Sequence, residues 1–270
     1  MIEETTHRRR VDDPDETITR ELSIPPPLGW ESLGMTNPGK VRGVNEDAFS
    51  VDNANRLWVV ADGMGGHSAG DVASQSIANA FNGLDTTDLL SETANRIETT
   101  LIELNQRFQD MASSGGDGVT IGSTVVICAY RQGWMLLAWV GDSRIYRWRN
   151  GTLHQLTQDH SQVEELISRG LLLRENAESH PAANVVTRAI GAAEDLYVDL
   201  DYCDAQPGDR YLLCSDGLTK EVPAPEIRRL MGQDASARHI CEGLIAATLN
   251  ANARDNVTVV VAKAHAAETR

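Results

Sequence analysis

The apolar residues of this chain change their spacing along the sequence, and this change constrains the fold most. Short apolar runs at 57–61, 123–130, 134–140 and 211–215 have the length and composition of buried strands. Two longer segments, 69–84 and 88–112, repeat apolar residues every three or four positions, which predicts amphipathic helices. Grouped strands with segregated helices indicate an α+β fold and argue against an alternating parallel sheet.

The other segments fit the same architecture. Strands are expected at 30–36, 48–52, 144–149, 152–156 and 256–262, and helices at 224–231 and 234–252. The dipeptide Asn150-Gly151 predicts a tight hairpin between the strands on either side of it. Residues 161 to about 183 read as helical and then irregular. We therefore predict a sandwich of two sheets with helices packed outside.

The ends of the chain differ from its middle. Residues 1–27 are polar and charged and close on a run of three prolines, so they cannot bury enough apolar surface to offset the entropy of ordering. We predict a disordered N-terminal tail, which could also serve as a docking segment or carry a phosphorylation site. The folded domain is expected from Leu28 to Ala264, followed by a short C-terminal tail, 265–270.

Composition excludes several functions. The net charge of −15 is unfavourable for electrostatic binding of nucleic acid. The four cysteines form no CxxC pair, so zinc spacing and a disulfide framework are both absent. The sequence contains no apolar run near the roughly 20 residues of a membrane span and no signal-peptide core. We expect a cytoplasmic monomer with reduced thiols.

Aspartates at strand ends are the strongest chemical signal. Asp62, Asp142 and Asp216 each follow an apolar run, and Asp255 precedes the last strand. Carboxylates gathered at one mouth of a sandwich repel one another unless cations neutralise them, and oxygen ligands select hard cations such as Mg²⁺, Mn²⁺ or Ca²⁺. One Asp-Gly dipeptide alone is usually only a turn, but the repeated arrangement favours a cation site.

Two further segments carry candidate phosphate chemistry. Arg42 lies four positions before the acidic pair Glu46-Asp47; this segment is either a solvated loop or a guanidinium that binds phosphate beside a metal. The glycine-rich segment 63–67 lacks the Lys-Ser/Thr of a Walker A motif, so a nucleotide-binding P-loop is not expected.

An ordered series of motifs resembles the type 2C metal-dependent serine/threonine phosphatases, the PPM family, in their compact bacterial form. The motifs are RGVNED at 42–47, VADGMGGH at 60–67, GST at 122–124, VGDSRIY at 140–146, LTQDHS at 156–161, TRAIG at 187–191, CSDGL at 214–218 and DNVT at 255–258. The resemblance covers residues 28 to 264 and implies a central antiparallel β-sandwich with helices on both sides, in α-β-β-α layers.

The resemblance also implies a centre of two to three Mn²⁺ or Mg²⁺ ions at one end of the sandwich. Two of these ions would be bridged by Asp62, with Asp216 and Asp255 on the first ion and Glu46 and the Gly63 carbonyl on the second.

Bacterial members often bind a third ion, for which Asp142 and Asp216 would be the ligands. By the same resemblance Arg42 would hold the substrate phosphate, and residues 161–183 would form a flap beside the active site. Many eukaryotic members have a histidine directly after the Asp-Gly, where this chain has Met64. His67 is therefore the candidate proton donor, unless it is a loop histidine with a secondary role.

The implied function is hydrolysis of phosphoserine and phosphothreonine in proteins by a metal-activated water, opposing a bacterial serine/threonine kinase. A non-catalytic sensor of the same fold is disfavoured because every metal carboxylate is present. A two-metal hydrolase of nucleotides or other small phosphoesters is the remaining alternative.

Overall fold

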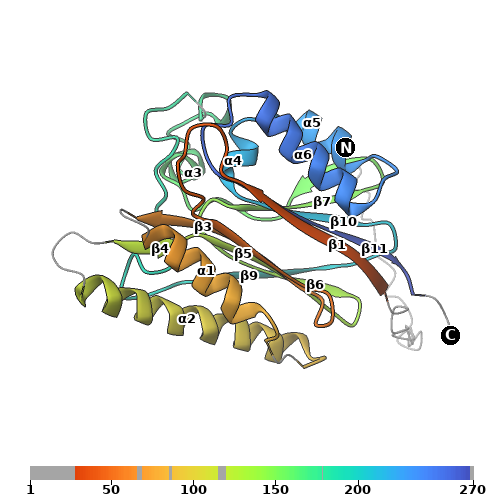
Figure 1. Ribbon diagram of the computed structural model, residues 1–270, viewed down its shortest axis with the longest axis horizontal. Helices are drawn as coiled ribbons and strands as arrows, with labels where there is room; N and C mark the ends of the chain where they lie inside the picture. Colours follow the sequence, from red (N-terminus) through yellow and green to blue (C-terminus); the bar gives the residue numbers. More distant parts are fainter. Residues whose placement is uncertain (1–27, 66–68, 85–86, 115–119, 178, 268–270) are drawn as a thin grey trace, which may run out of the picture.

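Two antiparallel sheets stacked face to face, each covered by helices on its outer side, make up the protein (Figure 1). The computed structural model describes residues 28–65, 69–84, 87–114, 120–177 and 179–267. The predicted N-terminal tail and His67 lie outside these ranges. The predicted α+β fold with α-β-β-α layers is confirmed.

One sheet has six strands in the order β2-β3-β5-β6-β9, with β4 paired to β3. Its strands are β2 (Asp47–Asp52), β3 (Leu57–Gly65), β4 (Ile121–Ser123), β5 (Val125–Arg131), β6 (Trp134–Val140) and β9 (Asp199–Asp204). The hairpin between β5 and β6 turns through Gln132 and Gly133, both with positive φ. Positive φ at both turn positions matches the right-handed twist of the flanking strands.

The other sheet has five strands in the order β1-β11-β10-β7-β8. Its strands are β1 (Leu28–Asn37), β7 (Arg144–Arg149), β8 (Thr152–Gln155), β10 (Arg210–Cys214) and β11 (Val257–Ala266). The predicted hairpin turn at Asn150-Gly151 is present, again with positive φ at both residues. Strand β11 continues to Ala266, two residues beyond the expected end of the folded domain.

Helices cover both outer faces. α1 (Ala69–Phe81) and α2 (Leu90–Ser114) lie on the six-stranded sheet, and α5 (Ala224–Met231) and α6 (Ala237–Asn250) lie on the five-stranded sheet (Figure 1). The short helices α3 (Gln162–Ser168) and α4 (Asp216–Thr219) lie toward one end of the sandwich, and the 3₁₀ turn η1 (Arg174–Asn176) follows α3 in the sequence. Among the described residues, no helix is both long and apolar enough to cross a membrane.

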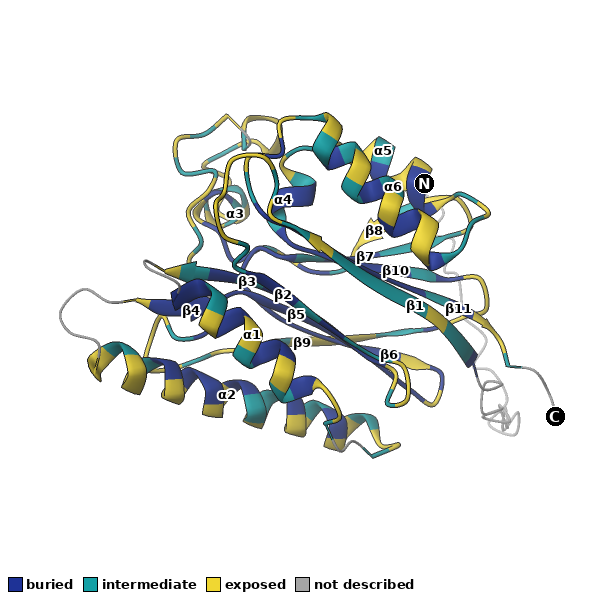
Figure 2. Ribbon diagram, in the orientation of Figure 1, coloured by how far each residue is buried: buried dark blue, intermediate teal, exposed yellow. Residues whose placement is uncertain are grey.

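Three apolar layers separate the four structural layers, and the inner faces of sheets and helices are buried accordingly (Figure 2). The layer between the sheets contains an aromatic cluster in which Trp30 packs on Trp58, Tyr130 and Tyr211, with ring centroids 4.9–6.0 Å apart. The buried indole of Trp58 also donates to Ser32 Oγ at 2.8 Å, so its polar group is satisfied.

The structure departs from the sequence expectation at three further places. The strand expected at 123–130 is divided at Thr124, whose amide donates to the Asp62 carbonyl at 2.9 Å instead of continuing one ladder. Strand β9 was not predicted; it is an edge strand that alternates Asp199 and Asp201 with Leu200, and aspartate is depleted in strands. The single helical turn α4 was also not predicted, because it is too short to show a period.

We expect Trp58→Ala to lower the free energy of unfolding by about 3–5 kcal/mol, the usual cost of deleting a large buried aromatic side chain. Urea denaturation followed by far-ultraviolet circular dichroism measures this change. Trp134→Ala is the matched control, because Trp134 is 43% exposed and surface changes cost little. Equal losses from both substitutions would contradict the assignment of Trp58 to the inter-sheet core.

Candidate metal centre

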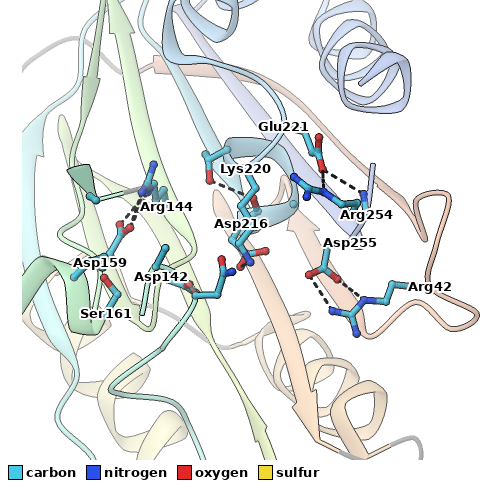
Figure 3. Close-up of a pocket in the computed structure, with 16 residues that line it drawn as sticks. Arg42, Asp142, Arg144, Asp159, Ser161, Asp216, Lys220, Glu221, Arg254 and Asp255 are labelled. Carbon is cyan, nitrogen blue, oxygen red and sulfur yellow. Dashed lines mark hydrogen bonds and ion pairs between the residues drawn. The ribbon is translucent and has the colours of Figure 1, made fainter. Parts of the chain in front are cut away.

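A cavity of about 620 Å³ opens at the end of the sandwich where the predicted aspartates lie (Figure 3). Its charged lining comes from loops at this end, from the start of β7, and from α4 and the residues directly after it. These residues are Arg42, Asp142, Arg144, Asp159, Asp216, Lys220, Glu221, Arg254 and Asp255. Residues of the predicted flap, including Ser161, Val163 and Ala183, complete one wall.

Asp62 sits near the end of β3, directly opposite Asp47 of β2 in the antiparallel register. The Asp62 carbonyl accepts hydrogen bonds from the Thr124 amide and from Ser123 Oγ, both at 2.9 Å, which fixes the backbone there. Asp47 is 2% exposed, and its Oδ2 accepts a hydrogen bond from Ser215 Oγ at 2.8 Å. This bond links the end of β10 to β2 across the two sheets.

Close backbone packing brings Asp216 beside Asp255. Asp216 is the first residue of α4, immediately after β10, and Gly217 follows it. A Cβ on Gly217 would lie 1.8 Å from the Asn256 carbonyl oxygen, so only glycine permits this approach. Gly63 is equally confined, because a Cβ there would lie 2.1 Å from the Gly70 carbonyl oxygen at the start of α1.

Asn256 ties the loop that carries Arg42 and Glu46 to the start of β11. Its Oδ1 accepts from the Glu46 amide at 2.8 Å, and its Nδ2 donates to the carbonyls of Pro38 and Val44, each at 3.0 Å. The Gly63 amide in turn donates to the Glu46 carbonyl at 3.0 Å. The loop 38–46 is therefore held against both sheets at the mouth of the cavity.

The turn after β6 presents Asp142. Gly141, with φ 110°, exchanges two hydrogen bonds with His160: its amide donates to Nδ1 at 3.0 Å and its carbonyl accepts from the His160 amide at 2.9 Å. Ser143 Oγ lies 2.7 Å from Thr124 Oγ1. These contacts fix the turn, and Asp142 itself is 8% exposed.

Burial and mutual repulsion shift the titration of this group of carboxylates. Desolvation, reinforced by the charges of Asp47, Asp216 and Asp142, raises the pKa of Asp62 well above its ordinary value. Desolvation likewise raises the pKa values of Asp47 and Asp142, each to about 7, with Asp216 adding repulsion at both. Charges brought this close are unfavourable until cations neutralise them.

Two of the carboxylates contact cationic side chains. Arg42 Nε lies 2.9 Å from Asp255 Oδ1 and its Nη2 donates to Oδ2 at 3.1 Å, a bidentate pair visible in Figure 3. Lys220 Nζ contacts Asp216 Oδ2. Within the described ranges, no three carboxylate, histidine or cysteine side chains converge closely enough to enclose an ion in this arrangement.

The donor set nevertheless fits hard divalent cations. Two carboxylate oxygens, Asp47 Oδ1 and Asp216 Oδ1, are buried and accept no hydrogen bond from any residue that the structure describes. A buried acceptor without a partner is costly, and a bound cation satisfies it. The donors at this end are oxygens, which suit Mg²⁺ and Mn²⁺ and give no preference to softer metals.

The predicted residues gather at this end to different degrees. Arg42, Asp142, Asp216 and Asp255 line the cavity together. Asp62 is not part of the lining, but its charge interacts with those of Asp142, Asp216 and Asp255.

Glu46 and Gly63 do not line the cavity either. They are joined to each other by one backbone hydrogen bond.

Sequence reasoning missed three features of the site. Asp47 was considered only within the acidic pair Glu46-Asp47, although it is the first residue of β2 and its side chain is buried. Lys220 is four residues after Asp216, a spacing that places two side chains on one helical face. The pair of Arg144 and Asp159, with contacts of 2.7–3.0 Å, joins residues from two separate motifs and had no local signal.

Comparison with known proteins identifies the family. A sequence profile described as protein phosphatase 2C matches residues 40–257. The serine/threonine phosphatase stp of Listeria monocytogenes is 37% identical over 235 residues, which cover 84% of this chain and 92% of the Listeria protein.

Solved structures agree with the sequence match. PppA, described as a key regulatory component of the T6SS in Pseudomonas aeruginosa, has a TM-score of 0.80 at 38% identity, over 87% of this chain and 97% of PppA. The catalytic domain of the phosphatase PstP in complex with two manganese ions has a TM-score of 0.79 at 30% identity, over 88% and 100% of the two chains. This chain belongs to the protein phosphatase 2C family of metal-dependent serine/threonine phosphatases.

Proposed function

We propose that this chain hydrolyses phosphoserine and phosphothreonine in proteins at a binuclear Mn²⁺ or Mg²⁺ centre built on Asp62. The observation that carries the proposal is the group of buried carboxylates around Asp62, together with the unpartnered Oδ1 atoms of Asp47 and Asp216. The two manganese ions of PstP, a relative of the same fold, support two ions here.

Each carboxylate has a proposed position around the pair of ions. Asp62 would bridge them, since its charge interacts with those of Asp47, Asp142, Asp216 and Asp255. Asp216 and Asp255 would complete the ligands of the first ion. Glu46 and the Gly63 carbonyl would bind the second, because the hydrogen bond between their backbones holds them together. When bound, the paired ions lower the pKa of a shared water and neutralise charge on the phosphate.

Arg42 is the proposed phosphate ligand. In the structure its guanidinium forms a bidentate pair with Asp255, and it is 51% exposed at the mouth of the cavity. The same planar fork matches a phosphate, so Arg42 would bind substrate in place of Asp255 if that carboxylate held a cation. His67 stays the proposed proton donor to the leaving serine or threonine oxygen; it lies outside the described residues.

The substrate class rests on the relatives and on the shape of the mouth. The matched Listeria protein is named a serine/threonine phosphatase. The cavity is wide, and one wall is the segment 161–183, which we propose acts as a flap that contacts the protein substrate. Cations on the rim, such as Arg254, suit acidic phosphopeptides. We propose that the substrates are products of a serine/threonine kinase.

The direct test is phosphate release from a phosphothreonine peptide with Mn²⁺, with Mg²⁺ and with EDTA. We expect release only with metal, and a loss of at least about 100-fold in Asp216→Asn, because removal of one catalytic electrostatic contact commonly costs 10²–10³ in rate. Asp201→Asn, on exposed β9, is the control and should keep its activity. Faster hydrolysis of nucleotides than of phosphopeptides would favour the small-phosphoester alternative.

Arg42→Ala should mainly raise KM for phosphopeptides, by about tenfold or more, because a hydrogen bond to a charged group contributes about 1.5–3 kcal/mol. Initial rates over a range of peptide concentrations separate KM from kcat. Arg42→Lys keeps the positive charge but loses the planar, bidentate guanidinium. Its KM should therefore lie between that of the wild type and that of Arg42→Ala. An unchanged KM would assign phosphate binding to another cation on the rim.

Asp62→Asn should raise the melting temperature of the metal-free protein at pH 8. The folded-state pKa of Asp62 is raised, so the folded protein binds protons more tightly than the unfolded chain and loses stability as pH rises above about 4. The gain from Asp62→Asn should therefore shrink as the pH is lowered toward 4, and Mn²⁺ should stabilise only the wild type.

Asp52→Asn is the control, because it should change the melting temperature at pH 8 in the opposite direction. Despite partial burial, hydrogen bonds from Asn55 and Gly83 hold the pKa of Asp52 below its ordinary value, so removing its charge should lower the melting temperature at pH 8. A lower melting temperature for metal-free Asp62→Asn at pH 8 would contradict the electrostatic account of the centre.

A further inference from the structure

Lys220 lies at the C-terminal end of α4 and reaches back over the site. Its amide donates to the Asp216 carbonyl at 2.9 Å, and its Nζ contacts Asp216 Oδ2. Residues four apart on one helical turn share a face, so the backbone itself aims this ammonium at Asp216. The Lys220 side chain is 35% exposed, and that of Asp216 is 14% exposed.

The two carboxylate oxygens of Asp216 have different surroundings. Oδ2 is paired with the Lys220 ammonium, whereas Oδ1 is buried and accepts no hydrogen bond from the described residues. Asp216 can therefore offer Oδ1 to an ion shared with Asp62 and Asp255 while Oδ2 stays with the lysine. A third ion held by Asp142 and Asp216 would instead need Oδ2.

Asp142 lines the same cavity as Lys220, and the two opposite charges interact favourably. The charges of Asp216, Asp142 and Asp255 all act on Lys220 in turn. Lys220 thus provides positive charge in the region between Asp142 and Asp216, where a third divalent ion would bind.

Each arginine that lines the cavity forms an ion pair with an acidic residue other than Asp216. Arg144 forms a bidentate pair with Asp159, with contacts of 2.7–3.0 Å. Arg254 Nε lies 3.1 Å from Glu221 Oε1, at the outer rim. Arg42 holds Asp255, as described above. Lys220 is therefore the cation that directly contacts Asp216 among the residues that the structure describes.

We propose that the Lys220 ammonium replaces a third metal ion between Asp142 and Asp216, so that the centre of this chain holds two divalent ions. The inference rests on the proposed function, because it concerns the same set of carboxylates that the proposed function places around the metal ions. A tethered cation is always present at high local concentration, and a divalent ion would have to displace it against charge repulsion. The fully loaded centre then contains two divalent ions.

The test is the number of Mn²⁺ ions bound per full-length chain, measured by equilibrium dialysis and elemental analysis. We expect two for the wild type, three for Lys220→Met, which removes the charge at similar volume, and two for Lys220→Arg, which keeps the charge. Asp142→Asn in the Lys220→Met background should return the count to two. Lys40→Met, which removes a lysine from the loop 38–46 without touching a carboxylate, is the matched control and should keep two.

Each outcome has a defined meaning. Three ions in the wild type, or two in folded Lys220→Met, would overturn the proposal while leaving a metal centre intact. A wild type that binds no Mn²⁺ would instead defeat the proposed function itself. Circular dichroism verifies that the variants are folded; should Lys220→Met not fold, the wild-type count and the same measurement on Lys220→Gln still decide between two and three ions.

Discussion

Repulsion among buried carboxylates at one end of the sandwich is the constraint on which the rest of the site depends. Asp62, Asp142 and Asp216 come from three strand ends in both sheets, and each raises the cost of ionising another. Such a group persists only if the scaffold is stable enough to carry it and if cations neutralise it in use. The apolar layers that bury the two sheets and their helices supply that stability.

The scaffold positions the carboxylates through hydrogen bonds and close contacts to the backbone. Asn256 joins the loop 38–46 to β11, and Gly217 lets α4 approach the Asn256 carbonyl. Both contacts connect segments that are far apart in sequence. The site therefore forms only when the two sheets have stacked. The order of the proposed metal ligands along the chain says little about their neighbours in space.

Much of the fold could be predicted from the sequence, because the spacing of apolar residues along the chain shows which face of each helix or strand is buried. The period of three to four in α1 and α2, and the apolar runs of β3, β5 and β6, each follow from the face they bury. Strand β9 was missed because aspartate has a low propensity for strands. Its aspartates are tolerated because β9 lies at the edge of the sheet. At the site, Asp62 and Asp216 stood out as aspartates after apolar runs, whereas the pairing of Arg144 with Asp159 depends on tertiary structure alone.

We propose that these carboxylates hold a pair of divalent ions bridged by Asp62. A crystal structure of the Mn²⁺-loaded protein, with anomalous scattering measured at the manganese edge, tests it most directly. We expect two manganese peaks about 3.5–4 Å apart with Asp62 between them, and Arg42 released from Asp255. Peaks away from Asp62, or a loaded protein in which Asp62 contacts no manganese, would contradict it.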